Sequence, residues 1–374
     1  MVYLKLKNKL IILLLLVLLL GILLFALDSP YLHALYGDTS QLESLTMQDN
    51  RTNLSIVVTG DEMFGRNTPA VLSLEDSPYK YVSNVTSNCD ILLVNTENPF
   101  TTSGNAVKPD VPLKANPKYI PLLNGTSGMV ISANANNHVF DYGVTGMMDS
   151  IENLDSYGIA HIGAGENKQE ATKPVTVEKE GHKITIFNYM DSENFQEYSQ
   201  SVMPMATDDS PGYSAWSDTE SVEQIRQAKE NGSDIIIVYM HYGNEYSRSP
   251  NENQKEISHL AIDAGATAVV GAHAHVTEGI EVYNGKPIFY NLGNFMFDQS
   301  NPNTHTAYFV RFDVNDENVT ANVYPIYISG YLPHFMGSSD GESLLSSLSP
   351  QCSQMEITSQ GTGKINFSLK NSTE

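Results

Sequence analysis

The sequence predicts an α/β domain in which buried strands alternate with helices, followed by a second, largely antiparallel sheet packed on the first. Short apolar runs rich in β-branched residues recur between residues 54 and 271, and each is too short for a helix. Several segments between these runs place apolar residues three or four apart, the spacing of one helix face. After residue 285 the strand-like runs follow one another without helical segments between them.

The first predicted element is an apolar helix at the N-terminus. Residues 10–27 are eighteen consecutive uncharged residues, mostly Leu and Ile, which is near the lower limit for crossing a ~30 Å hydrocarbon core. Basic residues precede this run and an acid follows it: Lys5, Lys7, Lys9 and Asp28. The positive-inside rule therefore predicts a single-pass transmembrane anchor in the cell membrane, with residues 1–9 in the cytoplasm and the C-terminal part outside.

The alternative for this helix is a cleaved signal peptide. Its apolar core would be long against the ~7–15 residues usual for signals, and no clear A-x-A cleavage site follows. Residues 28–53 are polar and weakly periodic, so we expect a tether between the anchor and the domain. Sequons of the N-x-S/T type recur from residue 50 onward and permit glycosylation outside the membrane without demonstrating it.

The domain is predicted to span residues 54–330. Its α/β part contains six buried strands: Leu54–Thr59, Ile91–Asn95, Met129–Ala133, Ile184–Tyr189, Ile235–Met240 and Ala268–Gly271. Three helices are predicted between them, two of which end at a glycine: Gly143–Tyr157, Ser221–Asn231 and Ile257–Ala264. The later strands are Ile288–Leu292, Thr306–Val314 and Val319–Ile328.

Two further features complete the predicted organisation. Asp316 and Glu317 indicate a hairpin turn between the last two strands. Residues 331–374 are rich in Ser and Gly with weak periodicity, so we expect a C-terminal tail that either wraps the domain or is mobile.

Composition limits the function classes. Hydrophobic residues make up 41% of the 374 residues and charged residues 17%, which excludes disorder over most of the chain. The formal net charge of −22 repels phosphate backbones, so we expect no nucleic-acid partner. Two cysteines exclude a disulfide-dense fold and a four-cysteine zinc site. Whether Cys89 and Cys352 pair is left open, and a free, buried Cys89 is the alternative.

Polar residues stand directly after five of the predicted strands. In open α/β sheets, ligands collect outside the carboxyl ends of the strands. The side chains at these ends are acids, amides and imidazoles, with no thiolate among them: Asp61, Glu97, Asn134, Asn136, Asn137, His138, Asp141, His241, His273 and His275. This donor set favours Mn, Zn, Fe or Mg over copper or an iron–sulfur cluster.

Each of these motifs alone also has a structural explanation. A Gly-Asp at a strand end is usually a turn, Asn137 can cap a helix, and a single His241 is more often a satisfied core histidine. The His273-x-His275 pair is stronger, because alternate residues in an extended segment point the same way. The metal-site prediction depends on all five polar motifs occurring at equivalent strand ends of one chain.

From residue 54 to 330 the chain resembles the CapA/PgsA family of capsule and poly-γ-glutamate synthesis proteins. That family looks like a branch of the calcineurin-like metallophosphatase superfamily. The stretches that carry the resemblance are VTGDEMFGR (58–66), VNTENPF (94–100), ANNHVFDYGVTGMMDSIENLDSYGIAHIGAG (135–165), MHYGNEY (240–246) and DAGATAVVGAHAHVTEGIEVYNGKPIFYNLGNFMFD (263–298). The resemblance implies a four-layer α/β/β/α sandwich.

The resemblance also implies roles for individual residues. It implies one or two divalent ions, with Mn, Zn or Fe expected, held by Asp61, a bridging Glu97, Asn137, His241, His273 and His275. His138 would be a general acid oriented by Asp141. Arg66 would bind an anionic substrate group. Apart from the resemblance, Asn294 in the segment LGNF is expected as a second substrate-binding residue that caps the site, and the alternative is that it serves only in a turn. The phosphatases usually have a histidine where this chain has Met63, which removes one ligand and puts occupancy of the first metal position in question.

Two functions follow from this set of expectations. The first is metal-dependent hydrolysis or transfer on a phosphoester or an amide-linked polymer such as poly-γ-glutamate. The second is a non-enzymatic surface subunit that binds anionic polymer and supports the membrane subunits of a polymer synthase. The net charge of −22 opposes a polyanionic substrate unless metal ions and Arg66 offset it locally.

Overall fold

The computed structural model describes residues 54–370, apart from 73–76, 108–110, 196–198, 200 and 350–351. The predicted cytoplasmic segment, anchor and tether (1–9, 10–27 and 28–53) therefore lie outside the described residues. Within the described part of the chain, every helix is too short or too polar to cross a membrane.

The larger sheet has ten strands, and one half of it is parallel and the other half antiparallel. Strands β1, β2, β3 and β4 run side by side in parallel, and β14 pairs antiparallel with β1 on the other side. β15 and β18 continue the antiparallel half, while β13 pairs with β1 and β16 with β15. The bounds are β1 (Leu54–Glu62), β2 (Ile91–Thr96), β3 (Met129–Ala133), β4 (Ala160–Ile162), β13 (Asn294–Met296), β14 (Thr306–Asn315), β15 (Asn318–Ser329), β16 (Leu332–Phe335), β17 (Glu356–Ile357) and β18 (Gly363–Ser368).

The second sheet has six strands in the order β11-β12-β10-β9-β7-β6. Its centre is parallel, because β7, β9, β10 and β12 run in the same direction. The bounds are β6 (Val175–Lys179), β7 (His182–Met190), β9 (Ile235–His241), β10 (Ala268–Ala272), β11 (Ile280–Tyr283) and β12 (Lys286–Phe289). A separate two-stranded sheet joins β5 (Ala164–Gly165) and β8 (Gly212–Tyr213).

This pairing corrects one expectation. The alternating strands were predicted to form one sheet and the later strands another, and that division was wrong. β1, β2 and β3 belong to the larger sheet, whereas β7, β9 and β10 belong to the six-stranded sheet. β14 and β15 extend the larger sheet, and β12 joins the six-stranded sheet. The buried strands of both sheets have the same apolar composition, so composition does not reveal which strands pair.

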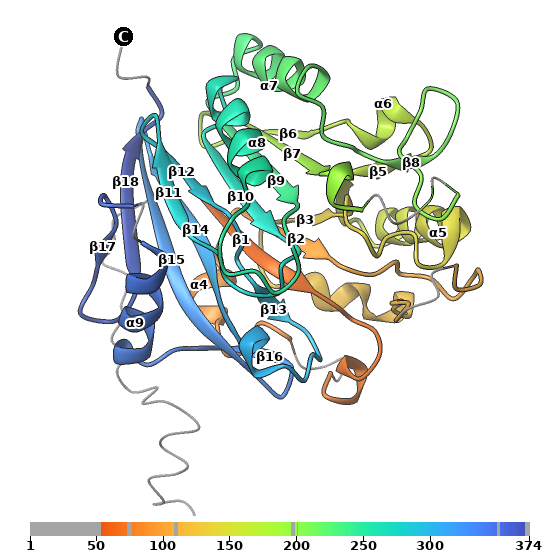
Figure 1. Ribbon diagram of the computed structural model, residues 1–374, viewed down its shortest axis with the longest axis horizontal. Helices are drawn as coiled ribbons and strands as arrows, with labels where there is room; N and C mark the ends of the chain where they lie inside the picture. Colours follow the sequence, from red (N-terminus) through yellow and green to blue (C-terminus); the bar gives the residue numbers. More distant parts are fainter. Residues whose placement is uncertain are drawn as a thin grey trace, which may run out of the picture. The chain divides into compact units, whose positions relative to one another are not determined.

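The two sheets face each other across a shared apolar core to which both contribute, for example through Ile56 and Ile237. Helices α7 and α8 cover the outer face of the six-stranded sheet, through residues such as Ile225 and Ile257. On the outer face of the larger sheet lie α4, η2 and the end of α5. The order is helices, sheet, sheet and helices (Figure 1). The helices are η1 (Thr68–Ala70), α4 (Ser83–Thr86), η2 (Pro117–Leu123), α5 (Gly143–Ser156), α6 (Lys168–Ala171), η3 (Ser192–Phe195), α7 (Glu220–Glu230), α8 (Glu252–Asp263), η4 (Pro302–His305) and α9 (Ser338–Leu348).

Helix α8 begins five residues before the predicted start at Ile257. The extra turn comes from a capping box: Asn251 Oδ1 accepts from the Gln254 main-chain N–H at 2.8 Å, and Gln254 Oε1 accepts from the Asn251 N–H at 2.9 Å. The box satisfies two main-chain donors that a helix start otherwise leaves unpaired. The first turn is polar, so apolar periodicity alone missed it.

Residues after 330 contribute ordered structure to the domain. β18 pairs with β15 over Gly363–Ser368, and α9 buries Leu344, Leu345 and Leu348. The segment expected as a tail thus adds strands and a helix to the domain. The sequence pattern did not indicate these strands, because β18 is short and its apolar alternation is only partial. Cys89 and Cys352 are both free and buried.

Candidate metal centre

The two sheets bring the predicted site residues together at one edge. β1, β2 and β3 of the larger sheet and β9 and β10 of the smaller sheet all end there. Asn188 near the end of β7 connects the two sheets: its Oδ1 accepts from the Ala135 N–H at 2.7 Å, and its Nδ2 donates to the Tyr239 carbonyl at 3.1 Å. The loop after β3 is therefore held against β9.

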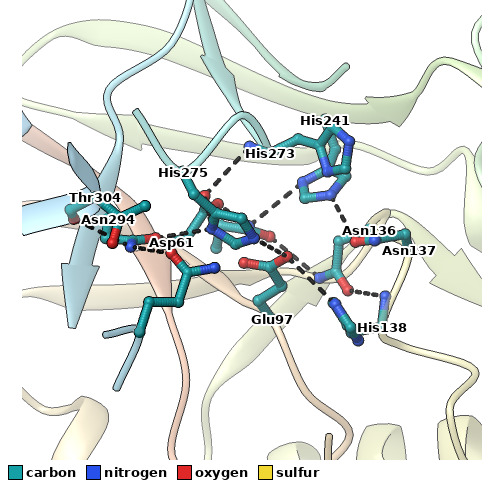
Figure 2. A network of polar contacts seen from close by, with 12 residues as sticks. Asp61, Glu97, Asn136, Asn137, His138, His241, His273, His275, Asn294 and Thr304 are labelled. Atoms are coloured by element: carbon teal, nitrogen blue, oxygen red, sulfur yellow. Dashed lines mark hydrogen bonds and ion pairs between the residues drawn. The ribbon is translucent and has the colours of Figure 1, made fainter. Parts of the chain in front are cut away.

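Two groups of buried side chains at this edge have the geometry of metal sites. Asp61, Glu97 and His275 place one donor atom each within 4.8 Å of one another, and Glu97, His241 and His273 do the same. Glu97 belongs to both groups and lies between them (Figure 2). A carboxylate shared by two adjacent donor sets is suited to bridging two ions.

Neighbouring polar groups orient these donors. Asp61 Oδ1 accepts from Asn95 Nδ2 at 2.7 Å, and Asp61 Oδ2 accepts from the His273 main-chain N–H at 3.3 Å. His275 Nδ1 lies 2.8 Å from Asn294 Oδ1, which fixes the orientation of the imidazole (Figure 2). Partners of this kind orient metal ligands and tune their basicity.

Asn137 and His241 meet directly. His241 Nε2 lies 2.9 Å from Asn137 Oδ1, and both side chains are buried. The adjacent Asn136 donates from Nδ2 to Asn95 Oδ1 at 3.1 Å and to the Thr96 carbonyl at 3.0 Å. The loop after β3 is thereby tied to the end of β2, which places Asn137 beside the group of Glu97, His241 and His273.

His138 occupies the rim of the same centre. Its Nδ1 lies 2.6 Å from Asp141 Oδ2, and its Nε2 lies 3.8 Å from Glu97 Oε1. The same Asp141 oxygen also accepts from the Leu113 N–H at 2.6 Å, which holds the carboxylate in place. The His138 side chain is 14% exposed, so its Nε2 faces the centre from a position that solvent or a substrate can reach.

The buried carboxylates of the centre act electrostatically on the neighbouring ionisable side chains. Burial lowers the pKa of His275, but the carboxylates of Glu97 and Asp61 outweigh burial and raise that pKa to about 10. Burial raises the pKa of the Tyr239 hydroxyl well above its usual value, and Asp61, Glu62 and Glu97 raise it further. The centre is therefore a buried region of negative potential that favours a positive charge.

Two aromatic rings wall the centre on its apolar side. Phe195, in η3 after β7, packs edge-on against His273 with ring centroids 4.8 Å apart and stacks on His241 at 6.0 Å. Phe297 packs against His275 at 4.9 Å. Phe195 follows a predicted strand, but that strand end carries none of the predicted donor residues, so the sequence motifs did not indicate Phe195.

The remaining predicted residues are placed differently. Asn294 lies on β13 opposite Asp61 and contacts His275. Arg66 lies outside both donor groups, and its side chain is 30% exposed and forms an ion pair with Asp298. Met63 is buried in an apolar cluster with Leu113 and Phe297, so its side chain packs there and does not join the donors.

Comparisons with known proteins agree with the resemblance predicted from the motifs. The profile of the family described as Bacterial capsule synthesis protein PGA_cap matches residues 55–299. The chain is 32% identical over 297 residues to the PGA biosynthesis protein CapA of Bacillus subtilis (strain 168), covering 78% of this chain and 74% of that protein. It is 29% identical over 285 residues to the capsule biosynthesis protein CapA of Bacillus anthracis, covering 74% and 67%.

Solved structures match this chain only at low sequence identity and low TM-score. The sulfate thiohydrolase SoxB of Thermus thermophilus matches at 10% identity and a TM-score of 0.42, over 81% of this chain and 62% of that chain. A 5'-nucleotidase from Candida albicans matches at 12% identity and a TM-score of 0.40, over 69% and 47%. The family profile, in contrast, covers more than half of the sequence, and the chain therefore belongs to the bacterial capsule synthesis protein family PGA_cap.

Proposed function

We propose that this protein is a membrane-anchored, extracytoplasmic member of a capsule or poly-γ-glutamate-type biosynthesis system, with a metal-dependent hydrolase or transferase site in a metallophosphatase-type sandwich. The observation that carries the proposal is the pair of buried donor groups that share Glu97. A polymer-binding surface alone would not require three histidines and two carboxylates converging below the surface from the ends of four strands.

The donor set fits one or two divalent ions. Asp61, Glu97 and His275 would hold one ion, and Glu97, His241, His273 and the Asn137 amide oxygen would hold the other. Mixed imidazole and oxygen donors suit Mn, Zn or Fe. An ion bound there would act as a Lewis acid and would make water at the site more acidic.

The chain's own residues supply the proton chemistry. His138 Nε2 faces Glu97 and would hold the proton that a leaving group needs. Asp141 bonds Nδ1 and so fixes the ring orientation and tautomer. Phe195 and Phe297 exclude water from the apolar side of the centre. The reaction class supported by this arrangement is hydrolysis or transfer at a phosphoester or amide bond.

The proposed location and partners rest on the sequence and on relatives. The charge-flanked apolar run at residues 10–27 supports a single-pass anchor with the domain outside the cytoplasm. A Mycobacterium tuberculosis relative, 29% identical over 229 residues, is named a probable polyglutamine synthesis accessory protein. That name supports the membrane subunits of a polymer synthase as partners.

Elemental analysis of the purified full-length protein tests the proposal. We expect one or two equivalents of Mn, Zn or Fe in the wild type and loss of the metal in His273→Ala/His275→Ala. The matched control is His182→Ala/His334→Ala, which alters two histidines outside both donor groups and is expected to keep the metal. Circular dichroism of each variant checks that it folds.

The second candidate function predicts a different outcome. A non-enzymatic polymer-binding subunit fits the accessory name of the mycobacterial relative. Absence of metal from the wild type, even after reconstitution with Mn, Zn or Fe, would sink the catalytic proposal and favour that subunit role. A metal-loaded protein that cleaves neither phosphoesters nor poly-γ-glutamate would limit the metal to a structural or binding role.

A further inference from the structure

Eight non-glycine residues among those described have a positive φ angle, and they fall into two sets. The first set occupies the two-residue turns of β-hairpins, where such angles are required: Glu180, Asn284, Asp316 and Tyr331. The second set lies around the candidate metal centre instead: Arg66, Tyr246, His273 and His275. Left-handed backbone is unfavourable for these residue types and persists where the surrounding structure enforces it, most often at functional sites.

His273 and His275 are explained by the donor groups, but Arg66 and Tyr246 belong to neither. Tyr246 has a φ of 62° and is held by a hydrogen bond from its main-chain N–H to the Ala274 carbonyl at 2.8 Å. Ala274 stands between the two histidines. The loop after β9 therefore fixes Tyr246 to the histidine loop, although the side chain is 49% exposed.

Arg66 is fixed by different contacts, which also lead to His275. Its backbone φ is 47°, and its guanidinium lies 5.6 Å from the ring centroid of Phe297, which itself packs on His275. Asp298 pairs with Arg66 and also accepts from the Asn67 N–H at 3.0 Å, so this buried acid orients the guanidinium. The Tyr246 ring lies 6.1 Å from His275, on whose ring Phe297 also packs.

Both side chains border the imidazole of His275. The Tyr246 ring contacts it directly, and the Arg66 guanidinium lies over Phe297, whose ring packs on it. A guanidinium offers five N–H donors and a phenol one O–H, a combination suited to a substrate oxyanion.

We propose that Arg66 and Tyr246 form an oxyanion subsite at the mouth of the metal centre, which anchors a charged group of the substrate beside the bond that reacts. The oxyanion is a carboxylate of an acidic polymer or the phosphoryl group of a phosphoester. The inference deepens the proposed function and rests on it. A chain with a net charge of −22 repels such substrates at long range, so a local cation decides where they bind.

Calorimetric titration of the full-length protein tests the subsite, with poly-γ-glutamate oligomers and phenyl phosphate as separate probes. We expect Arg66→Gln to weaken binding about tenfold and Tyr246→Phe about threefold, the loss of a charged and a neutral donor. The matched controls are Arg226→Gln, on the exposed face of α7, and Tyr157→Phe, which is 47% exposed at the end of α5. Both controls are expected to bind within twofold of wild type.

The two probes distinguish the source of the oxyanion. Loss of oligomer binding assigns the subsite to a polymer carboxylate, and loss of phenyl phosphate binding alone assigns it to a phosphoryl group. Metal content measured on the same samples separates this inference from the proposed function. Variants that keep their metal and bind both probes like wild type, or a wild type that binds neither, overturn the subsite and leave the metal result standing. Loss of metal in Arg66→Gln also overturns it, because the residue would then act on the ligands.

Discussion

The hydroxyl of Tyr239, on β9, donates a hydrogen bond to the main-chain carbonyl of Thr59, on β1, at 2.9 Å. The bond crosses the buried core between the two sheets. Tyr239 stands two residues before His241, and Thr59 stands two residues before Asp61. This one contact therefore sets the spacing between the donors that come from opposite sheets.

Tyr239→Phe is expected to lower the free energy of unfolding by about 1–2 kcal/mol, because it removes the hydroxyl donor and leaves the buried Thr59 carbonyl without that hydrogen bond. It is also expected to weaken metal binding, because the hydrogen bond that links β1 of one sheet to β9 of the other is lost. Tyr242→Phe is the control: its hydroxyl lies 2.9 Å from Ser258 Oγ, away from the sheet interface. Urea unfolding measures the stability of each variant and metal titration its metal affinity. An equal change of metal affinity in both variants would contradict this account.

Substitutions of single ligands are expected to separate the two donor groups. Asp61→Asn removes a donor from one group and His241→Ala from the other, so each variant should lose about one equivalent of metal if two ions bind. Glu97→Gln should reduce both, because Glu97 belongs to both groups. Equal metal loss in all three variants would show that the protein has one ion site, and elemental analysis decides between these outcomes.

His138→Asn is expected to slow hydrolysis according to the leaving group. A general acid contributes roughly 10²–10⁴-fold, but mainly where the leaving group must be protonated as it departs. The variant should therefore be strongly impaired on phenyl phosphate and only weakly on p-nitrophenyl phosphate, with metal content unchanged. A uniform loss on both substrates would instead assign His138 to binding.

Glu278 is expected to make stability depend on pH. It is fully buried, and burial raises its pKa from 4.5 to about 7, while the hydrogen bond from Gln254 Nε2, at 2.6 Å, opposes the rise. The folded state keeps a proton that the unfolded state releases. The associated stability is present below pH 4.5 and is lost as the pH rises to about 7.

Glu278→Gln mimics the protonated form and should remove this dependence. We expect the variant to exceed wild type by about 3 kcal/mol at pH 8 and by less than about 1 kcal/mol at pH 5. Glu256→Gln, an exposed position on α8, should stay within about 0.5 kcal/mol of wild type at both pH values. Urea unfolding at the two pH values measures the difference, and equal stability of Glu278→Gln and wild type at pH 8 would refute the role given to Glu278.

Local sequence patterns predicted the long buried strands of both sheets, because a buried strand needs an apolar run whatever its partner. Val130 and Ile131 lie in a strand with the predicted bounds, Met129–Ala133, and α5 differs from its prediction by one residue at its end. The polar start of α8 and the short strands after residue 330 were missed, because neither has a long apolar periodicity.

What the sequence determined by itself was the family and the types of the donor residues. Both are written in contiguous motifs at strand ends, where Asp61, Glu97 and His275 each follow a run that must be buried. Only the tertiary structure decided which strands pair, that Glu97 is shared between two donor groups, and that Phe195 and Tyr246 pack beside the histidines. These are contacts between residues far apart in the chain, and they depend on how two sheets of similar composition pack. Local hydrophobic periodicity does not specify that packing.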